Sequence, residues 1–247
     1  MKISIITITF NSAETVEDTI RSVLAQNYSD LEYIIIDGAS TDNTMAIVNR
    51  YRASIHTILS EPDRGIYDAM NKGVMLATGD VIGILNSDDF YANSTVLSDI
   101  ASLFRETGSD ACYADLVYVD RNDISRIVRT WKSGSYRNGR FLNGWMPPHP
   151  TFFVRRSVYQ AFGLYSLQLR SSADYELMLR FVHKHQVSLS YLPKIITRMR
   201  TGGQSNITLK NRWKANREDL LAWKMNGLRP GLLTLIRKPL SKLLQYF

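Results

Sequence analysis

Val81–Asp89 reads VIGILNSDD, in which a short apolar run passes directly into four polar residues. A continuous apolar run of this length is typical of a strand buried on both faces of a parallel sheet. Further strands are predicted at Ile3–Phe10, Tyr33–Ile36 and Ile55–Leu59, and stretches with apolar residues at helical spacing separate them. This alternation predicts an α/β protein of Rossmann-like architecture, with a mostly parallel central sheet and helices on both faces.

The second half of the chain is less regular. Cys112–Val119 and Ile124–Trp131 are predicted to form an antiparallel pair, and Ser133–Pro150 reads as a long loop. A helix is predicted from about Ala173 to His185, with Ser171 or Ser172 as its cap.

Composition excludes several classes of protein. The chain has 247 residues, of which 45% are hydrophobic and 21% charged, so it can bury a full core. No apolar run approaches the length of a membrane span. The single cysteine, Cys112, excludes a disulfide scaffold and a cysteine-built zinc site. Met1–Phe10 has no small-residue cleavage site and is interpreted as a first strand of a cytoplasmic protein.

The net charge of +7 is concentrated near the C-terminus, because eleven basic and two acidic residues from Arg198 onward leave a local balance of +9. These basic residues alternate with leucines, which favours either an amphipathic helix on an anionic membrane surface or a solvated helix packed on the core. Nucleic acid is not expected as a partner. We therefore expect a catalytic domain over residues 1–206 and a basic helical extension over residues 207–247.

The polar residues that follow the predicted strands should meet at one edge, because ligands bind beyond the carboxyl ends of parallel strands. Asp88 and Asp89 would supply oxygen ligands suited to Mg²⁺ or Mn²⁺, although an Asx turn capping the next helix explains them equally well. Asp37 could accept hydrogen bonds from a ribose or a base, or simply begin the Asp-Gly turn.

Two further residues are candidates for chemistry. Asp174 lies at the start of the predicted helix that runs to His185. It could act as a general base, although the helix dipole alone also favours an acid in a first turn. His149 lies between prolines in a rigid part of the long loop, where it could contact an acceptor or only pack.

Together these motifs resemble family 2 glycosyltransferases with the GT-A fold, and in particular the bacterial branch that builds O-antigen, colanic acid and capsule polysaccharides. The resemblance extends from Ser4 to about Ser205. The segments that carry it are SIIT at 4–7, DGASTD at 37–42, SEPDRGIYDAMNKG at 60–73, GD at 79–80, LNSDD at 85–89, HPTFF at 149–153 and ADYEL at 173–177.

The resemblance implies roles for individual residues. Thr9 and Asp37 would hold the nucleotide base, and Glu14 would line the same pocket. Arg64 and Asp68 would face the donor.

Asp88 would be the metal ligand with Asp89 beside it, and Asp174 would be the general base. The first acid of the family's DxD motif is Asn86 here, which implies a changed contact to the donor ribose or to the metal.

The implied function is an inverting, metal-dependent transfer of one sugar from a nucleotide-sugar, with a UDP-sugar favoured, to a saccharide on a polyprenyl diphosphate. The processive motif Gln-x-x-Arg-Trp is absent, because Leu209 precedes Arg212-Trp213 where glutamine would be required. The basic tail would place the enzyme on the inner face of the cytoplasmic membrane.

Three other functions are alternatives to sugar transfer. A dinucleotide oxidoreductase and a sugar nucleotidyltransferase both need a glycine-rich turn after the first strand, and Thr9–Glu14 contains no glycine. A non-catalytic nucleotide-sugar or membrane-surface binding module remains open if Asn86 has disabled the metal site.

Overall fold

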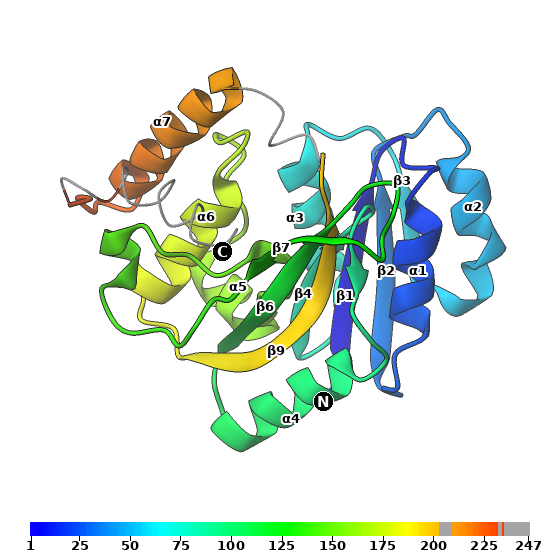
Figure 1. Cartoon of the computed structure of the whole chain (residues 1–247), viewed down its shortest axis with the longest axis horizontal. Helices are drawn as coiled ribbons and strands as arrows, with labels where there is room; N and C mark the ends of the chain where they lie inside the picture. Colours follow the sequence, from blue (N-terminus) through cyan, green and yellow to red (C-terminus); the bar gives the residue numbers. More distant parts are fainter. Residues whose placement is uncertain (203–208, 232–233, 235–247) are drawn as a thin grey trace.

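The computed structural model describes residues 1–202, 209–231 and 234 (Figure 1). Its first half alternates strands and helices as the apolar runs predict. The elements are β1 (Ile3–Thr9), α1 (Val16–Leu24), β2 (Leu31–Asp37), α2 (Thr44–Arg50), a 3₁₀ turn (Arg52–Ser54), β3 (Thr57–Ser60), α3 (Ile66–Leu76) and β4 (Val81–Asn86).

The second half adds mainly antiparallel strands and short helices. These are β5 (Phe90–Tyr91), α4 (Val96–Thr107), β6 (Ala111–Val119), β7 (Ile127–Trp131), 3₁₀ turns at Arg140–Asn143 and His149–Thr151, β8 (Phe153–Arg155), α5 (Arg156–Phe162), α6 (Ala173–Met178), a π-helical continuation (Leu179–Lys184), β9 (Leu189–Arg200) and α7 (Leu209–Met225). The predicted helix at 173–185 is thus present but changes its winding after Met178.

The strands of the described residues form one sheet in the order β3-β2-β1-β4-β8-β6-β9-β5, with β7 added beside β6. β3, β2, β1 and β4 are parallel, and β8 runs against both β4 and β6. β6 therefore points the same way as β4, and β9 pairs with it in parallel. The mostly parallel α/β sheet expected from the sequence is confirmed.

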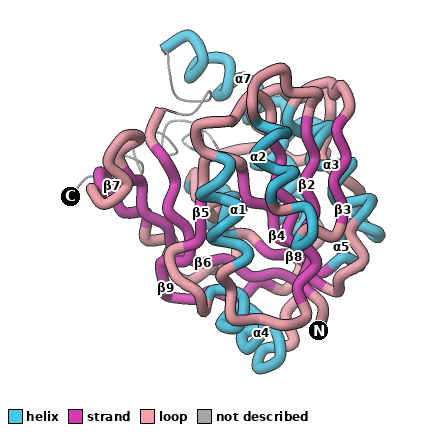
Figure 2. The backbone as a smooth tube through the Cα atoms, turned by 90° about the vertical axis from the view of Figure 1, so that its right-hand side faces the viewer, coloured by secondary structure: helices cyan, strands magenta, loops and turns pink. Residues whose placement is uncertain are grey.

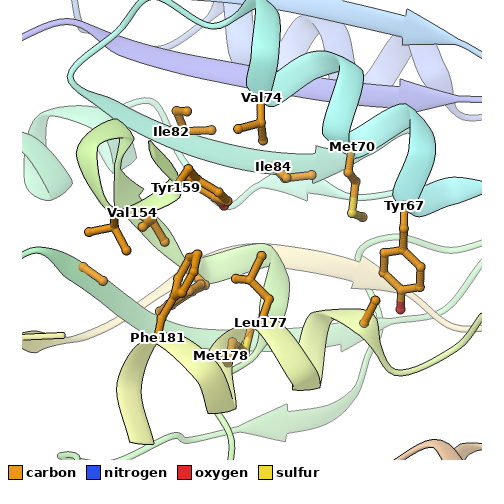
Figure 3. Packing of buried hydrophobic residues seen from close by; sticks show 14 of the residues in the cluster. Tyr67, Met70, Val74, Ile82, Ile84, Val154, Tyr159, Leu177, Met178 and Phe181 are labelled. Carbon is orange, nitrogen blue, oxygen red and sulfur yellow. The ribbon is translucent and has the colours of Figure 1, made fainter. Parts of the chain in front are cut away.

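Helices cover both faces of this sheet, as Figure 2 shows for α1, α2 and α3. Side chains alternate between the faces along a strand, and the core divides accordingly. In β2, Tyr33 and Ile35 belong to the cluster under α1, α2 and α4, whereas Ile34 and Ile36 belong to the cluster under α3, α5 and α6. Figure 3 shows the second cluster, in which α3 packs opposite α6 and its continuation.

Close packing of α3 on the sheet depends on a glycine. A Cβ atom at Gly73 would collide with the Ile6 side chain and crowd Ile36. The helix therefore approaches β1 and β2 more closely than any residue with a side chain would allow.

α7 is helical, as expected for the C-terminal extension, and its second half packs on α6. Trp223 is completely buried and belongs to the same core cluster as α6. The leucines from Leu232 onward, on which the amphipathic-tail prediction rests, lie outside the described residues. Within the described part of the chain, no helix is both long and apolar enough to cross a membrane.

Candidate active site

The carboxyl ends of β1, β2 and β4 meet at one edge of the sheet, as the α/β rule predicts. Thr9 pairs with Asp37 across the β1–β2 register, and Asn86 pairs with Ile8 across β1–β4. The Asn86–Asp89 turn and the Asp37 turn therefore open on the same side.

Asn86, His149 and Asp174 form a continuous chain of side chains at this edge. The Asn86 amide nitrogen lies 3.2 Å from His149 Nε2, and His149 Nδ1 lies 3.7 Å from an Asp174 carboxylate oxygen. Three segments far apart in the sequence thus meet, since β4, the 3₁₀ turn at His149–Thr151 and α6 each contribute one residue. The histidine joins the acidic turn to the proposed base.

The protonation state of His149 follows from these contacts. Because the Asn86 amide donates, Nε2 must accept, and the ring proton therefore lies on Nδ1, facing Asp174. Burial lowers the pKa of His149 below its usual 6.5, and the carboxylates of Asp174 and Asp88 only partly offset this effect. The imidazole is therefore neutral at pH 7 and presents an N–H dipole to Asp174.

Tyr67, at the start of α3, supplies a second contact to Asp174. Its hydroxyl donates to the other carboxylate oxygen at 3.2 Å. Burial, reinforced by the negative charge of Asp174, raises the pKa of Tyr67, so its hydroxyl keeps its proton. Figure 3 shows Tyr67 at the end of the row of α3 side chains that pack toward α6. Asp174 is thus oriented from both sides while its side chain remains 20% exposed.

The acidic turn offers oxygen ligands of unequal accessibility. Asp88 is half-buried, whereas Asp89 is completely buried, and its carboxylate oxygens have no hydrogen-bond partner among the described residues. Burial, together with the charge of Asp88, raises the pKa of Asp89. The amide oxygen of Asn86 is also buried, and it has no hydrogen-bond partner within the part of the chain that the structure describes.

These residues fit a hard divalent cation. Asp88 and Asn86 present a carboxylate and an unpartnered amide oxygen, the donor types that Mg²⁺ and Mn²⁺ prefer. Among the described residues, no three histidines, cysteines or acids converge as a complete metal cage. Such an ion would therefore share its coordination with substrate phosphates and water, which is usual for Mg²⁺.

Residues 4–163 match the family model described as Glycosyl transferase family 2. The match covers well over half of the 247 residues, although it ends before Asp174. The chain is a family 2 glycosyltransferase. A PGL/p-HBAD biosynthesis glycosyltransferase of Mycobacterium tuberculosis is 31% identical over 207 residues, which cover 82% of this chain and 78% of that protein. An uncharacterized glycosyltransferase of the same species is 31% identical over 72% of this chain and 68% of its own length.

Solved structures confirm the GT-A fold of this glycosyltransferase. S. aureus TarS residues 1–349, in complex with UDP-GlcNAc, superimposes with a TM-score of 0.71 at 19% identity, over 92% of this chain and 65% of that one. The mannosyltransferase PcManGT of Pyrobaculum calidifontis, in complex with GDP-Man and Mn²⁺, gives 0.64 at 15% identity, over all of this chain and 81% of its own. The chain spans about two fifths of the longer TarS structure.

In this glycosyltransferase, the residues expected to hold the nucleotide base are buried at the strand ends. Asp37 is completely buried, and its carboxylate accepts hydrogen bonds from Ser40 and Ser60. Thr9 is buried beside it, and over residues 1–202, 209–231 and 234 its hydroxyl finds no hydrogen-bond partner. The exposed Phe10 follows directly, with 56% of its surface accessible. The roles of Thr9 and Asp37 stay predictions.

The remaining donor candidates are Asp68, Arg64 and Glu14. Asp68 accepts hydrogen bonds from the backbone and side chain of Arg64, which lower the pKa of Asp68. Glu14 is 84% exposed and lies 3.4 Å from Arg121, where both line a pocket of about 300 Å³. The described residues that line this pocket do not include Thr9 or Asp37, and the role of Glu14 stays a prediction.

Tyr67, Arg200 and Glu218 also contribute to the site, and none of them was predicted from the sequence. Arg200, at the end of β9, is 4% exposed, donates to the Asp88 carbonyl oxygen at 2.8 Å and pairs with Asp18. Arg200 thus fixes the backbone of the acidic turn through the Asp88 carbonyl group. Tyr67 lies within the matching 60–73 segment, but nothing in its local sequence indicates its partner, since the two residues are 107 positions apart.

The predicted cap of the Asp174 helix is confirmed in its position but not in its hydrogen bond. Ser172 is the N-cap residue of α6, but its side chain makes no capping hydrogen bond. The backbone N–H groups of Arg170, Ser171 and Ser172, which lead into the helix, donate to one Glu218 oxygen at 3.1, 2.7 and 3.1 Å.

Proposed function

We propose that this chain transfers one sugar from a nucleotide-sugar, with inversion, to a hydroxyl of a saccharide acceptor. The proposal rests on the row of side chains Asn86–His149–Asp174. This row joins a turn that could bind metal and diphosphate to a carboxylate that could accept a proton. The nucleotide-sugars in the TarS and PcManGT structures support the donor class.

The proton is taken by Asp174. The acceptor hydroxyl attacks the anomeric carbon, the bond from that carbon to the diphosphate oxygen breaks, and the hydroxyl proton passes to the Asp174 carboxylate. Tyr67 and His149 both direct hydrogens toward this carboxylate and so hold it in one orientation. A single displacement inverts the anomeric carbon and needs one carboxylate rather than a pair.

The diphosphate leaves on the side of the acidic turn. A bound Mg²⁺ or Mn²⁺, held by Asp88 and the Asn86 oxygen, would neutralise the charge that grows on the leaving group. Asp89 is enclosed behind this turn, so Asp88 is the residue of the pair to which we assign the metal. Arg200 keeps the turn in place through the Asp88 carbonyl.

The acceptor and the location are part of the same proposal. A UDP-sugar is the favoured donor, because the TarS complexes contain UDP or UDP-GlcNAc. A lipid-linked saccharide acceptor, cell-surface polysaccharide synthesis and a position on the inner face of the membrane rest on the sequence resemblance and on the +9 charge of the C-terminal region. The missing processive motif supports one addition per encounter.

The test is a thermal-shift panel of UDP-GlcNAc, UDP-glucose, GDP-mannose and dTDP-glucose, each with Mn²⁺ and with EDTA. A ligand at 100 times its Kd stabilises the fold by about 2.7 kcal/mol, which raises Tm by roughly 5–10 °C for a chain of this size. We expect a metal-dependent shift with one UDP-sugar.

An Asp88→Asn variant should lose the metal-dependent part of the shift, whereas the exposed acid Glu106 on α4 offers a matched control in Glu106→Gln. A shift without any hydrolysis or transfer would instead indicate a non-catalytic binding module. No shift with any member of the panel would contradict the proposal.

A further inference from the structure

The Asp174 carboxylate is held by its own contacts and also by the backbone that carries it. Asp174 lies two residues after Ser172, in the first turn of α6. The residues before it, between α5 and α6, form neither helix nor strand over 163–172. The position of the base therefore depends on what fixes this connection.

Glu218 fixes it. A single carboxylate oxygen accepts three successive backbone N–H groups, from Arg170, Ser171 and Ser172. Charge-assisted bonds of this kind are about twice as strong as neutral ones. The three bonds thus fix the backbone that leads into α6, up to and including its N-cap residue Ser172.

Glu218 is in turn located by the packing of α7 on α6. The Trp223 indole is completely buried and donates to the Tyr175 hydroxyl at 2.9 Å. The Asn226 amide donates to Glu176 at 3.0 Å. These partners, Tyr175 and Glu176, are the two residues that follow Asp174 in α6, so α7 and the residue directly after it hold the helix just beyond the base.

We propose that Glu218 is a positioning residue for the Asp174 base, and that α7 thereby forms part of the active centre. The inference rests on the proposed function, in which Asp174 accepts the proton. Glu218 touches no reacting atom and acts only by fixing the backbone that carries Asp174.

The test uses the full chain and the acceptor-independent hydrolysis of UDP-GlcNAc with Mn²⁺, in which water takes the place of the acceptor hydroxyl. Glu218→Ala should lower kcat between about 10- and 100-fold, the range expected for a displacement of up to 1 Å. The Kd for UDP-GlcNAc should change less than about twofold, because the donor contacts lie elsewhere. Glu218→Gln keeps an acceptor oxygen and should lose less, and Glu106→Gln should behave as wild type.

A double-mutant cycle separates positioning from general destabilisation. In the Asp174→Asn background, Glu218→Ala should cost less than about twofold, since the group that it positions is already absent. An equal loss in both backgrounds, or a wild-type kcat in Glu218→Ala, would overturn the inference. If Glu218→Ala does not fold, a wild-type kcat in Glu218→Gln together with unchanged backbone exchange would overturn it.

Amide hydrogen exchange distinguishes this inference from the proposed function. Exchange at residues 170–178 should accelerate in Glu218→Ala, whether or not the wild-type chain hydrolyses UDP-GlcNAc. Failure of the wild type to act on any nucleotide-sugar would refute the proposed function. Unchanged exchange at these amides would refute the inference that Glu218 fixes the backbone before Asp174.

Discussion

Glu32 is a buried acid whose ionisation stabilises the edge of the sheet opposite the active site. It lies near the start of β2, 7% exposed, and accepts hydrogen bonds from Ser4, Thr78 and Lys2. Burial alone would raise the pKa of Glu32, but these bonds outweigh it and lower the pKa to about 2. Replacing it in Glu32→Gln removes the charge and leaves the neighbouring donors in place.

The size of the effect of Glu32 on the unfolding free energy follows from the difference between its pKa in the folded and in the unfolded chain. A pKa depressed in the folded state contributes stability above the unfolded value of 4.5, and this contribution is lost as the pH falls toward 2. A shift from 4.5 to about 2 corresponds to about 3 kcal/mol at pH 7. About 2 kcal/mol of this is lost between pH 7 and pH 3.

Urea unfolding of wild type and Glu32→Gln at pH 7, 5, 4 and 3 measures this directly. The difference in unfolding free energy should be largest at pH 7 and shrink by about 2 kcal/mol at pH 3. Glu106→Gln on the surface of α4 should show no such trend. A difference between wild type and Glu32→Gln that stays constant over this pH range would refute the reasoning.

Three further predictions concern packing, the site and the tail. Gly73→Ala should destabilise by about 1–3 kcal/mol, because its Cβ would collide with Ile6; an unchanged Tm would count against the close approach of α3. His149→Ala should lower kcat about 10- to 100-fold while donor Kd stays within about twofold, since it loosens Asp174 without touching the nucleotide edge; wild-type turnover would assign the histidine to packing alone. Removing residues 230–247 should reduce sedimentation with anionic vesicles and spare donor binding, and unchanged sedimentation would exclude the tail as the membrane contact.

The parallel half of the fold was predictable because its strands are buried on both faces. Such strands read as apolar runs, and β2 and β4 appear in the sequence as unbroken ones. Their shared edge then brings Asp37 and Asp88 to the same side of the sheet. The sheet direction could thus be inferred without any long-range information.

β8 and β9 were not predicted, because their local signals are weak. β8 has three residues, and β9 contains Pro193 and three basic residues in a run of mixed exposure. Their pairing with β6 and β4 depends on long-range contacts that no local pattern encodes. Arg200 therefore could not be placed under the acidic turn from the sequence.

The candidate site was also predictable only in part. Asp88, Asp174 and His149 could be singled out by residue type and by resemblance, and the structure brings His149 between Asn86 and Asp174. Ser172 is the N-cap residue of α6, as predicted, but its side chain makes no capping hydrogen bond, and a carboxylate 46 to 48 residues away binds the N–H groups that lead into the helix. A capping pattern in the sequence cannot exclude such a distant partner.

The role of Asp174 is tested most directly by measuring donor binding and turnover in the same Asp174→Asn preparation. The asparagine keeps the shape and the contact to Tyr67 but is not a base. We predict an unchanged Kd for the nucleotide-sugar and a loss of turnover of about 10²–10⁴-fold. Turnover near the wild-type value would contradict the assignment and place the base on another residue.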